Sequence, residues 1–235
     1  MKRKICILAS GILLWGLNVH MVCAEEVSTK YSVDEVIAYF NEVVLDTEYA
    51  TGEGDYTVVQ KWVDPIYYRI NGVATDEDKE MLQYLCNGLN SIEGFPGIYP
   101  EDNENYANME LNFWGRDNFY LYMGDCINYE EADGAVEYWY DNVGNYIHYA
   151  TVGYRVDVDQ EVRNSVILEE IVNGLGMTDT EVRTDSIAYN GYSTVQELSE
   201  MDWLLLELLY CPEIQCGMGA SECEEIIRNL WEIKQ

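Results

Sequence analysis

One helical segment, Gln160 to Gly174, constrains the fold of this chain more than any other stretch of its sequence. At about 100° per residue, its apolar side chains cover almost the whole circumference of a helix, so we expect burial on several sides. One stripe of the same helix nevertheless becomes polar at Glu169, Glu170 and Asn173. Buried carboxylates are costly unless they are paired, hydrogen-bonded or bound to a cation. The segment therefore predicts a central helix with a polar cluster in a largely buried setting.

Other helices are indicated by their first residues. Ser32 with Glu35, and Ser199 with Asp202, have the spacing of capping boxes, and Thr75 is a good cap for the helix that follows it. Apolar residues keep helical spacing after each of these caps. We expect helices over residues 32–45, 76–92, 160–174, 198–210 and 221–233.

Strands are indicated in the first and middle parts of the chain. Residues 56–70 are typical of an extended segment, in which Pro65 predicts an edge position or an interruption. Residues 107–114 alternate apolar and polar side chains, and residues 118–124 are predicted as a further strand-like piece. Residues 137–158 are typical of a hairpin followed by a long strand. No internal repeat or linker is visible, so we predict one α+β domain over residues 25–235, with a mixed sheet packed against several helices.

Residues 1–24 have the pattern of a secretory signal peptide. A basic start is followed by an apolar run and by Val22, Cys23 and Ala24 as a cleavage site. A retained membrane anchor and a lipoprotein attached through Cys23 are the alternatives, and the bulk of Val22 disfavours the second. The rest of the chain has no long uncharged apolar run. We expect a secreted or cell-surface protein with no membrane span after cleavage.

The charge of the chain restricts its partners. The formal net charge is −30, and all 43 acidic residues follow the predicted signal peptide. Such a field repels nucleic acid and anionic polymers, so we expect no nucleic-acid partner. It favours cations and basic peptides, or it simply keeps the surface solvated. With 48% hydrophobic and 13% aromatic residues, the chain can still bury a core.

Five cysteines follow the predicted cleavage site. Outside the cytoplasm we expect some of them to form disulfides, and the odd number leaves at least one thiol unpaired within a monomer. The connectivity stays open, although the three C-terminal cysteines are close enough in sequence to predict one bridge among them. A zinc site there would lack both a C-x2-C pair and a nearby histidine. The disulfide candidates are Cys86, Cys126, Cys211, Cys216 and Cys223.

The polar stripe of the central helix continues into a spaced motif. Glu169-Glu170-x-x-Asn173-x-x-Gly176-x-x-Asp179 resembles the metzincin zinc signature, H-E-x-x-H-x-x-G-x-x-H or -D. The resemblance places Glu169, Asn173 and Asp179 at the three metal-ligand positions. It places Glu170 at the position of the general base and Gly176 at the turn glycine.

The resemblance extends downstream of the motif. Ser186, Ile187 and Ala188 resemble the metzincin Met-turn, with Ala188 where methionine would stand, and residues 198–210 resemble the helix that follows it. The whole pattern is still more similar to a bacterial family, domain of unknown function 2927. These resemblances imply a zincin-like fold. The segments that carry the second one are residues 169–176, 186–187, 198–210 and 217–218.

The departures from the zinc signature change the expected metal. Imidazole and thiolate hold Zn²⁺ tightly, whereas glutamate, asparagine and aspartate offer only oxygen, which suits Ca²⁺ or another hard divalent cation. His148 is the only histidine after the predicted signal peptide, and we interpret it as an ordinary strand residue. We therefore do not expect zinc.

Two functional hypotheses follow. The first is a noncatalytic extracytoplasmic binding or structural module, a pseudoprotease with a degenerate metal site, which engages a peptide or protein along a sheet edge as zincins do. The alternative is a metal-dependent peptidase in which Glu170 is the general base and the three ligand positions hold a divalent cation. In a purely structural interpretation, Glu169 and Glu170 bond tyrosine hydroxyls or an arginine, and Gly174 and Gly176 end the helix. The sequence names no ligand and no oligomeric state.

Overall fold

The computed structural model describes residues 30–45, 57–124 and 132–233. The predicted signal peptide and Cys126 lie outside these ranges. Within them, no helix has both the length and the apolar character needed to cross a membrane.

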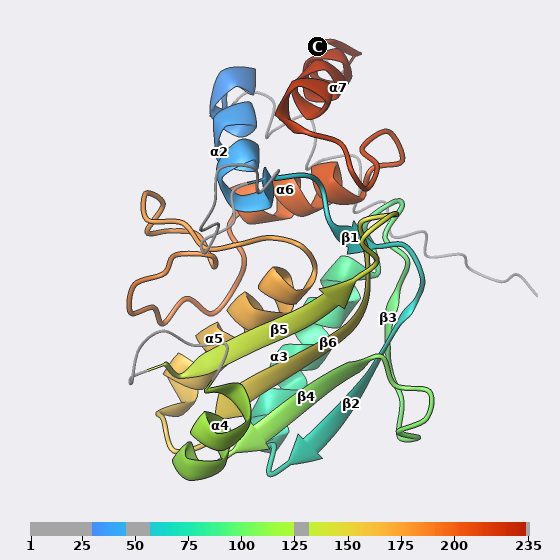
Figure 1. Cartoon of the computed structure of the whole chain (residues 1–235). Coiled ribbons are helices and arrows are strands. Elements are labelled where there is room, and N and C mark those ends of the chain that lie inside the picture. Colours follow the sequence, from blue (N-terminus) through green and yellow to red (C-terminus); the bar gives the residue numbers. More distant parts are fainter. Residues whose placement is uncertain (1–29, 46–56, 125–131, 234–235) are drawn as a thin grey trace, which may run out of the picture.

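The centre of the fold is a six-stranded sheet (Figure 1). The spatial order β1-β6-β4-β2-β3 is entirely parallel, and β5 adds to β6 as an antiparallel neighbour. The sheet is therefore mixed, as predicted, but its mostly parallel pairing makes the fold α/β rather than α+β. The strands are β1 (Lys61–Trp62), β2 (Ile66–Gly72), β3 (Ile98–Pro100), β4 (Met109–Trp114), β5 (Gly134–Tyr140) and β6 (Tyr146–Arg155).

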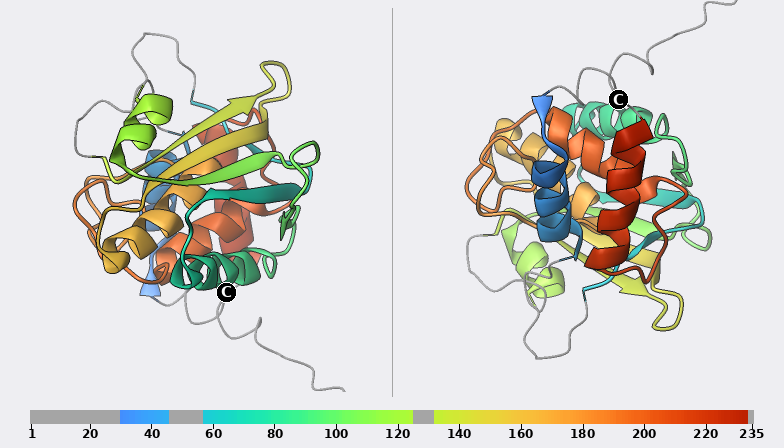
Figure 2. Two further views of the ribbon diagram at one scale, coloured as in Figure 1. Left: turned by 90° about the horizontal axis from the view of Figure 1, so that it is seen from below. Right: turned by 90° about the horizontal axis from the view of Figure 1, so that it is seen from above.

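Helices cover both faces of this sheet. α3 and α5 pack against each other, and α5 lies against β5 and β6, while α4 packs on β6 from the opposite face (Figure 2). Beyond α5, α2 packs on α6 and α7 to form a separate helical layer. The helices are α2 (Val33–Leu45), α3 (Asp76–Leu89), α4 (Arg116–Met123), α5 (Gln160–Gly174), α6 (Glu200–Tyr210) and α7 (Ala220–Ile233).

The predicted helix starts are confirmed at atomic detail. The backbone N–H of Glu35 donates to the Ser32 hydroxyl at 3.2 Å, and the Glu35 carboxylate accepts from the Ser32 N–H at 2.8 Å. Full capping boxes also begin α3, from Thr75, and α6, from Ser199. These signals were readable because each capping bond is made within three residues of the chain.

One predicted strand is a helix, and the predicted extended segment around Pro65 is divided into two strands. Residues 118–124, predicted as strand-like, belong mostly to helix α4. Phe119 and Met123 are four residues apart and both buried, and a Cβ at Gly153 of β6 would touch both side chains. The consecutive aromatic and apolar residues 119–122 are typical of a strand, so the helical spacing of the two buried residues was not recognised. Pro65 interrupts the extended segment between β1 and β2, and β2 itself is an inner strand.

The predicted bridge among the C-terminal cysteines is not formed. Cys86, Cys211, Cys216 and Cys223 are all free thiols. Cys216 instead donates through its Sγ to the carbonyl of Lys61 (3.7 Å), and burial raises the pKa of Cys223 to about 11. The three C-terminal thiols thus lie near Lys61 or within α7, and Cys86 is buried in α3.

Residues 59–61, which lead into the sheet, are joined to residues 209–218. The N–H of Val59 donates to the carbonyl of Met218 (2.9 Å), and the N–H of Gly217 donates back to the carbonyl of Val59 (2.8 Å). Lys61 is 7% exposed, and its Nζ donates to the carbonyls of Leu209 (2.7 Å) and Ile214 (2.5 Å). The strand that enters the sheet is therefore held by the segment between α6 and α7.

Candidate functional site

The helix with the polar stripe lies directly beneath the edge strand. α5 carries four fully buried apolar residues, which confirms the prediction of a central helix: Ile167, Leu168, Ile171 and Val172. Gly134, the first residue of β5, approaches α5 so closely that a Cβ there would lie 2.2 Å from Val166 Cγ1 and 2.9 Å from Glu170 Oε1. Glycine is therefore required where the edge strand passes over Glu170.

Glu170 is buried, with 8% of its surface exposed. It lies near Tyr154 of β6, which is completely buried. Burial raises the pKa of Tyr154 well above its ordinary value, and the negative charge of Glu170 raises it further. Within the part of the chain that the structure describes, the Tyr154 hydroxyl has no hydrogen-bond partner. Glu170 thus sits between α5 and the sheet, beside a tyrosine that stays protonated.

Asn173 and Asp179, two of the predicted metal-ligand positions, bond each other. The Nδ2 of Asn173 donates to Asp179 Oδ1 at 2.7 Å. The other amide atom of Asn173, Oδ1, is buried and has no partner among the described residues. Glu169, the remaining ligand position, is half-buried one helical turn before Asn173. The structure therefore brings two of the three predicted ligand positions into direct contact.

The predicted ligand positions differ in the groups that they turn towards one another. Within residues 30–45, 57–124 and 132–233, no three His, Cys, Asp or Glu side chains are grouped so that they could hold a metal ion. Asn173 turns its NH₂, which is a donor and cannot ligate, towards Asp179. His148 is exposed on β6, where its ring contacts that of Tyr146 at 6.5 Å between centroids.

The end of α5 is fixed by aromatic donors and by Gly176. Trp62 Nε1 donates to the carbonyl of Gly174 (2.8 Å), and the Tyr210 hydroxyl donates to that of Leu175 (2.9 Å). Gly176 has φ +107°, and a Cβ there would lie 2.0 Å from the carbonyl oxygen of Gln60. This turn requires glycine for its conformation and for its contact, as the motif predicted.

Residues 186 and 187 are tied to the start of α6. Asp202, fully buried, accepts hydrogen bonds from the Ser186 hydroxyl (2.5 Å) and from the N–H of Ile187 (3.1 Å). It also accepts from the N–H of Ser199 in its capping box (2.8 Å). The capping box was visible in the sequence, but the bonds to residues 186 and 187 were not.

The outer edge of β5 presents backbone groups that pair with no described strand, a feature that the sequence did not locate. The N–H of Arg155 donates to the carbonyl of Asp133 (2.9 Å), and the next paired residues are Ala135 with Gly153, and Glu137 with Thr151. Hydrogen-bonded and non-hydrogen-bonded pairs alternate in an antiparallel ladder. The residues between these pairs therefore turn their backbone N–H and C=O away from β6: Gly134, Val136 and Tyr138.

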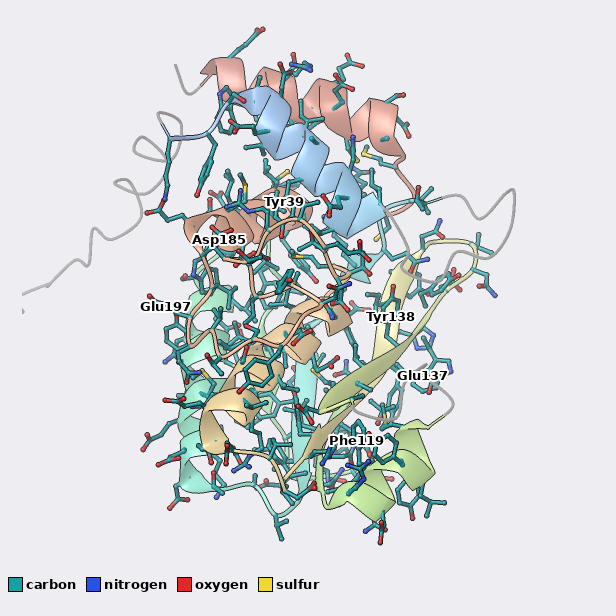
Figure 3. The ribbon with its side chains drawn as sticks, turned by 90° about the vertical axis from the view of Figure 1, so that its left-hand side faces the viewer. Tyr39, Phe119, Glu137, Tyr138, Asp185 and Glu197 are labelled. Carbon is teal, nitrogen blue, oxygen red and sulfur yellow. The ribbon has the colours of Figure 1, made fainter. Side chains whose placement is uncertain are left out.

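The side chains of β5 alternate between two surroundings (Figure 3). Tyr138 lies on the α5 side and donates its hydroxyl to Gln60 Oε1 at 3.1 Å. Glu137 and Trp139 lie on the other side, where Glu137 is exposed and Trp139 is 40% exposed. The Trp139 ring lies 5.3 Å from that of Tyr149 on β6, measured between centroids.

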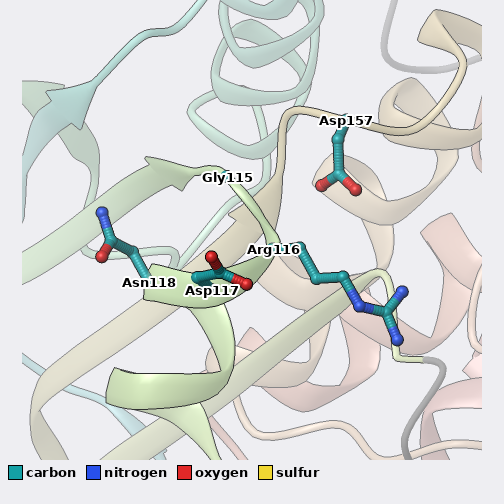
Figure 4. A pocket seen from close by; sticks show the side chains of 5 residues that line it. All are labelled: Gly115, Arg116, Asp117, Asn118 and Asp157. Atoms are coloured by element: carbon teal, nitrogen blue, oxygen red, sulfur yellow. The ribbon is translucent and has the colours of Figure 1, made fainter.

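A shallow pocket of about 410 Å³ lies elsewhere, where β4 ends and α4 begins (Figure 4). Its lining combines two acidic residues with Arg116. One of the acids, Asp157, accepts two bonds from Arg155 (3.2 and 2.7 Å), and these bonds lower its pKa. The pocket contains none of the residues of the polar stripe. It is lined by Gly115, Arg116, Asp117, Asn118 and Asp157.

Comparison with models of protein families gives a match. A family model described as "Protein of unknown function (DUF2927)" matches residues 33–229, from the first residue of α2 to the last part of α7. No curated protein matches the chain.

Proposed function

The chain belongs to the family described as Protein of unknown function (DUF2927), and on that premise we propose that it is a noncatalytic, extracytoplasmic binding module that holds an extended polypeptide along the edge of β5. The family membership agrees with the resemblance of the sequence, and the description names no activity. We therefore infer the function from the backbone and side-chain groups that the fold exposes.

The observation that carries the proposal is the backbone of β5. Gly134, Val136 and Tyr138 direct their N–H and C=O groups away from β6, and β5 pairs with no other described strand. An extended peptide can satisfy such groups by adding one strand to the sheet. The strand is seven residues long, enough for several main-chain hydrogen bonds.

A zincin-like frame is part of this proposal. β6 leads into α5, Gly176 makes the tight turn after the helix, and Ser186 and Ile187 return to the start of α6. The order of these features supports a zincin-like frame, because the metzincin resemblance implies the same order. Zincins engage peptides along a sheet edge, which supports the same use of β5 here.

The absence of catalysis is proposed from the surroundings of the polar stripe. A general base must reach the water or substrate from which it takes a proton. Glu170 lies between α5, Gly134 and the buried ring of Tyr154. Asn173 donates to Asp179, so two groups that would ligate a cation hold each other instead.

A metal-dependent peptidase is the second candidate, and one observation favours it. Asn173 Oδ1 is a buried acceptor without a partner among the described residues, and an amide oxygen is an acceptable ligand for Ca²⁺. In this candidate Glu169, Asn173 and Asp179 hold the cation, and Glu170 accepts the proton of the attacking water.

The two candidates separate by metal content and stability. We expect the purified protein to contain no stoichiometric metal, and its melting temperature to be the same in EDTA and in millimolar Ca²⁺. A rise of several degrees with Ca²⁺, abolished in Asp179→Asn, would favour the peptidase, because a ligand that binds only the folded state raises its stability. Cleavage of a peptide library that is lost in Glu170→Gln would establish it.

The edge itself is tested by amide NMR. Addition of seven-residue peptides with β-forming sequences, the length of β5, should shift the amide signals of Gly134, Val136 and Tyr138. The amides of Ala135 and Glu137, which face β6, should move less. Equal shifts in both sets, or shifts confined to distant helices, would contradict binding at this edge.

A further inference from the structure

We infer that the polypeptide held at β5 is cationic, with lysine or arginine at every second position, facing Glu137 and Trp139. This inference rests on the proposed function, since it presumes that a strand is added at the edge. It specifies the chemistry of the partner and the register of its side chains.

The charge of the protein selects a cationic partner. The chain has 43 acidic and 13 basic residues, and its net charge of −30 repels an anionic strand. Arginines that follow β5 in the chain are already engaged by carboxylates and offer no site for an anion. These pairs are Arg155 with Asp133 and Asp157, Arg163 with Asp78, Arg183 with Asp185, and Arg228 with Asp34 and Glu224.

The pleat of the sheet selects alternate positions. Side chains of directly opposed residues on two neighbouring strands point to the same face, with Cβ atoms about 5 Å apart. A peptide residue opposite Glu137 or Trp139 therefore points to the exposed face of β5. The peptide residues between these positions point towards α5, on the face of Gly134, Val136 and Tyr138.

The exposed face of β5 suits a basic side chain. Glu137 presents a carboxylate at the centre of the strand. Trp139, two residues later and 40% exposed, presents an indole ring next to Tyr149. A guanidinium can pair with the first and stack on the second, because a cation is attracted to the face of an indole ring. Two arginines at alternate positions of one extended peptide can therefore contact the Glu137 carboxylate and the Trp139 ring at the same time.

Labelled seven-residue peptides, matched to β5 in length, test this inference by fluorescence anisotropy. One peptide alternates arginine and threonine, a second has the same composition in two blocks, and a third alternates glutamate and threonine. Two further versions of the first carry N-methyl groups on the nitrogens of either its arginines or its threonines. N-methylation removes a main-chain donor and leaves the charge unchanged.

We expect the alternating arginine peptide to bind at least about fivefold more tightly than the block peptide, and the glutamate peptide to bind weakest. One N-methylated version should lose binding and the other should keep it, because only alternate N–H groups face β5. Glu137→Gln should weaken binding about threefold. Glu225→Gln, the same change on the exposed surface of α7, should leave it unaltered.

The measurements distinguish failure of the cationic-partner inference from failure of the proposed edge-binding function. If the glutamate and arginine peptides bind equally and one N-methylated version fails, the edge function stands and the cationic partner is wrong. If the block peptide binds as well as the alternating one and neither N-methylation matters, the attraction is electrostatic without strand addition, and both proposals fail. Absence of binding by every peptide also removes the proposed function.

Discussion

The start of α6 and the C-terminal half of α5 both contain a buried carboxylate. The polar groups around these two carboxylates differ in how completely they are hydrogen-bonded. Asp202 accepts from Ser186 and from two backbone N–H groups. Around Glu170, the Tyr154 hydroxyl and Asn173 Oδ1 are buried without partners among the described residues. Buried polar groups are normally paired, and a complete network fixes one conformation. The first region therefore uses its polar groups for structure, whereas the second keeps hydrogen-bonding capacity unused.

The largest effect should come from the complete network. Asp202→Ala removes the acceptor of three hydrogen bonds and leaves buried donors unsatisfied, so we expect a loss of about 3–5 kcal/mol in the free energy of unfolding, measured with urea. Asp202→Asn should cost less, since its amide oxygen can still accept. A loss below about 1 kcal/mol for the alanine variant would break the comparison.

The pH dependence of stability tests the comparison at a second buried aspartate, Asp78. Asp78 is fully buried and bonded to Arg163 and Gln160; burial acts to raise its pKa, but these bonds outweigh it and the pKa is lowered. A lowered pKa gives stability that is present above the ordinary value of 3.8 and is lost as the pH falls through the folded value. We expect Asp78→Asn to lose about 2–3 kcal/mol at pH 7.

The difference between Asp78→Asn and the unsubstituted protein should shrink as the pH falls below about 4, because the native carboxyl is then also neutral. Urea unfolding between neutral and acid pH measures this convergence. A constant difference at every pH would mean that the ionised form of Asp78 contributes nothing.

Two buried tyrosines, Tyr210 and Tyr154, differ in whether their hydroxyl is hydrogen-bonded within the described residues. Tyr210 is 1% exposed and donates its hydroxyl to the carbonyl of Leu175. Tyr210→Phe leaves that carbonyl without its donor, so the free energy of unfolding should fall by about 1 kcal/mol. Thermal unfolding at neutral pH is sufficient to detect the change. No loss would show that the end of α5 does not depend on this bond.

The smallest effect is expected at Tyr154. Its hydroxyl is buried without a partner among the described residues, so Tyr154→Phe removes a polar atom that contributes no bond. We expect a change within about 0.5 kcal/mol, or a slight gain in stability. A loss as large as that of Tyr210→Phe would mean that the hydroxyl is bonded in solution, and the two regions would then be alike.

Local signals in the sequence predicted the parts of the fold that are made within a few residues. The caps at Ser32, Thr75 and Ser199 are of this kind, and so is the hairpin turn, where Asp141 Oδ1 accepts from two following N–H groups. The apolar pattern of α5 also sufficed to predict its burial. Membership of the family was predicted from spaced motifs and is confirmed over residues 33–229.

Long-range pairing was not predictable in the same way. The parallel register of β4 with β6 joins residues about forty positions apart, and no local pattern states it. The motif placed Asn173 and Asp179 together, but not their direct bond. The cysteine spacing suggested a bridge, whereas the position of Lys61 among the C-terminal carbonyls, which organises that segment, has no signal in the sequence.

The joining of Val59 and Lys61 to residues 209–218 also sets when the protein can fold. During synthesis Val59 is made long before Met218, its hydrogen-bond partner, so β1 cannot dock until residues 209–218 have left the ribosome. A chain that stops before Leu209 would have to bury the Lys61 ammonium without its carbonyl acceptors, which is costly. We therefore expect chains that end before Leu209 to remain open and to be degraded.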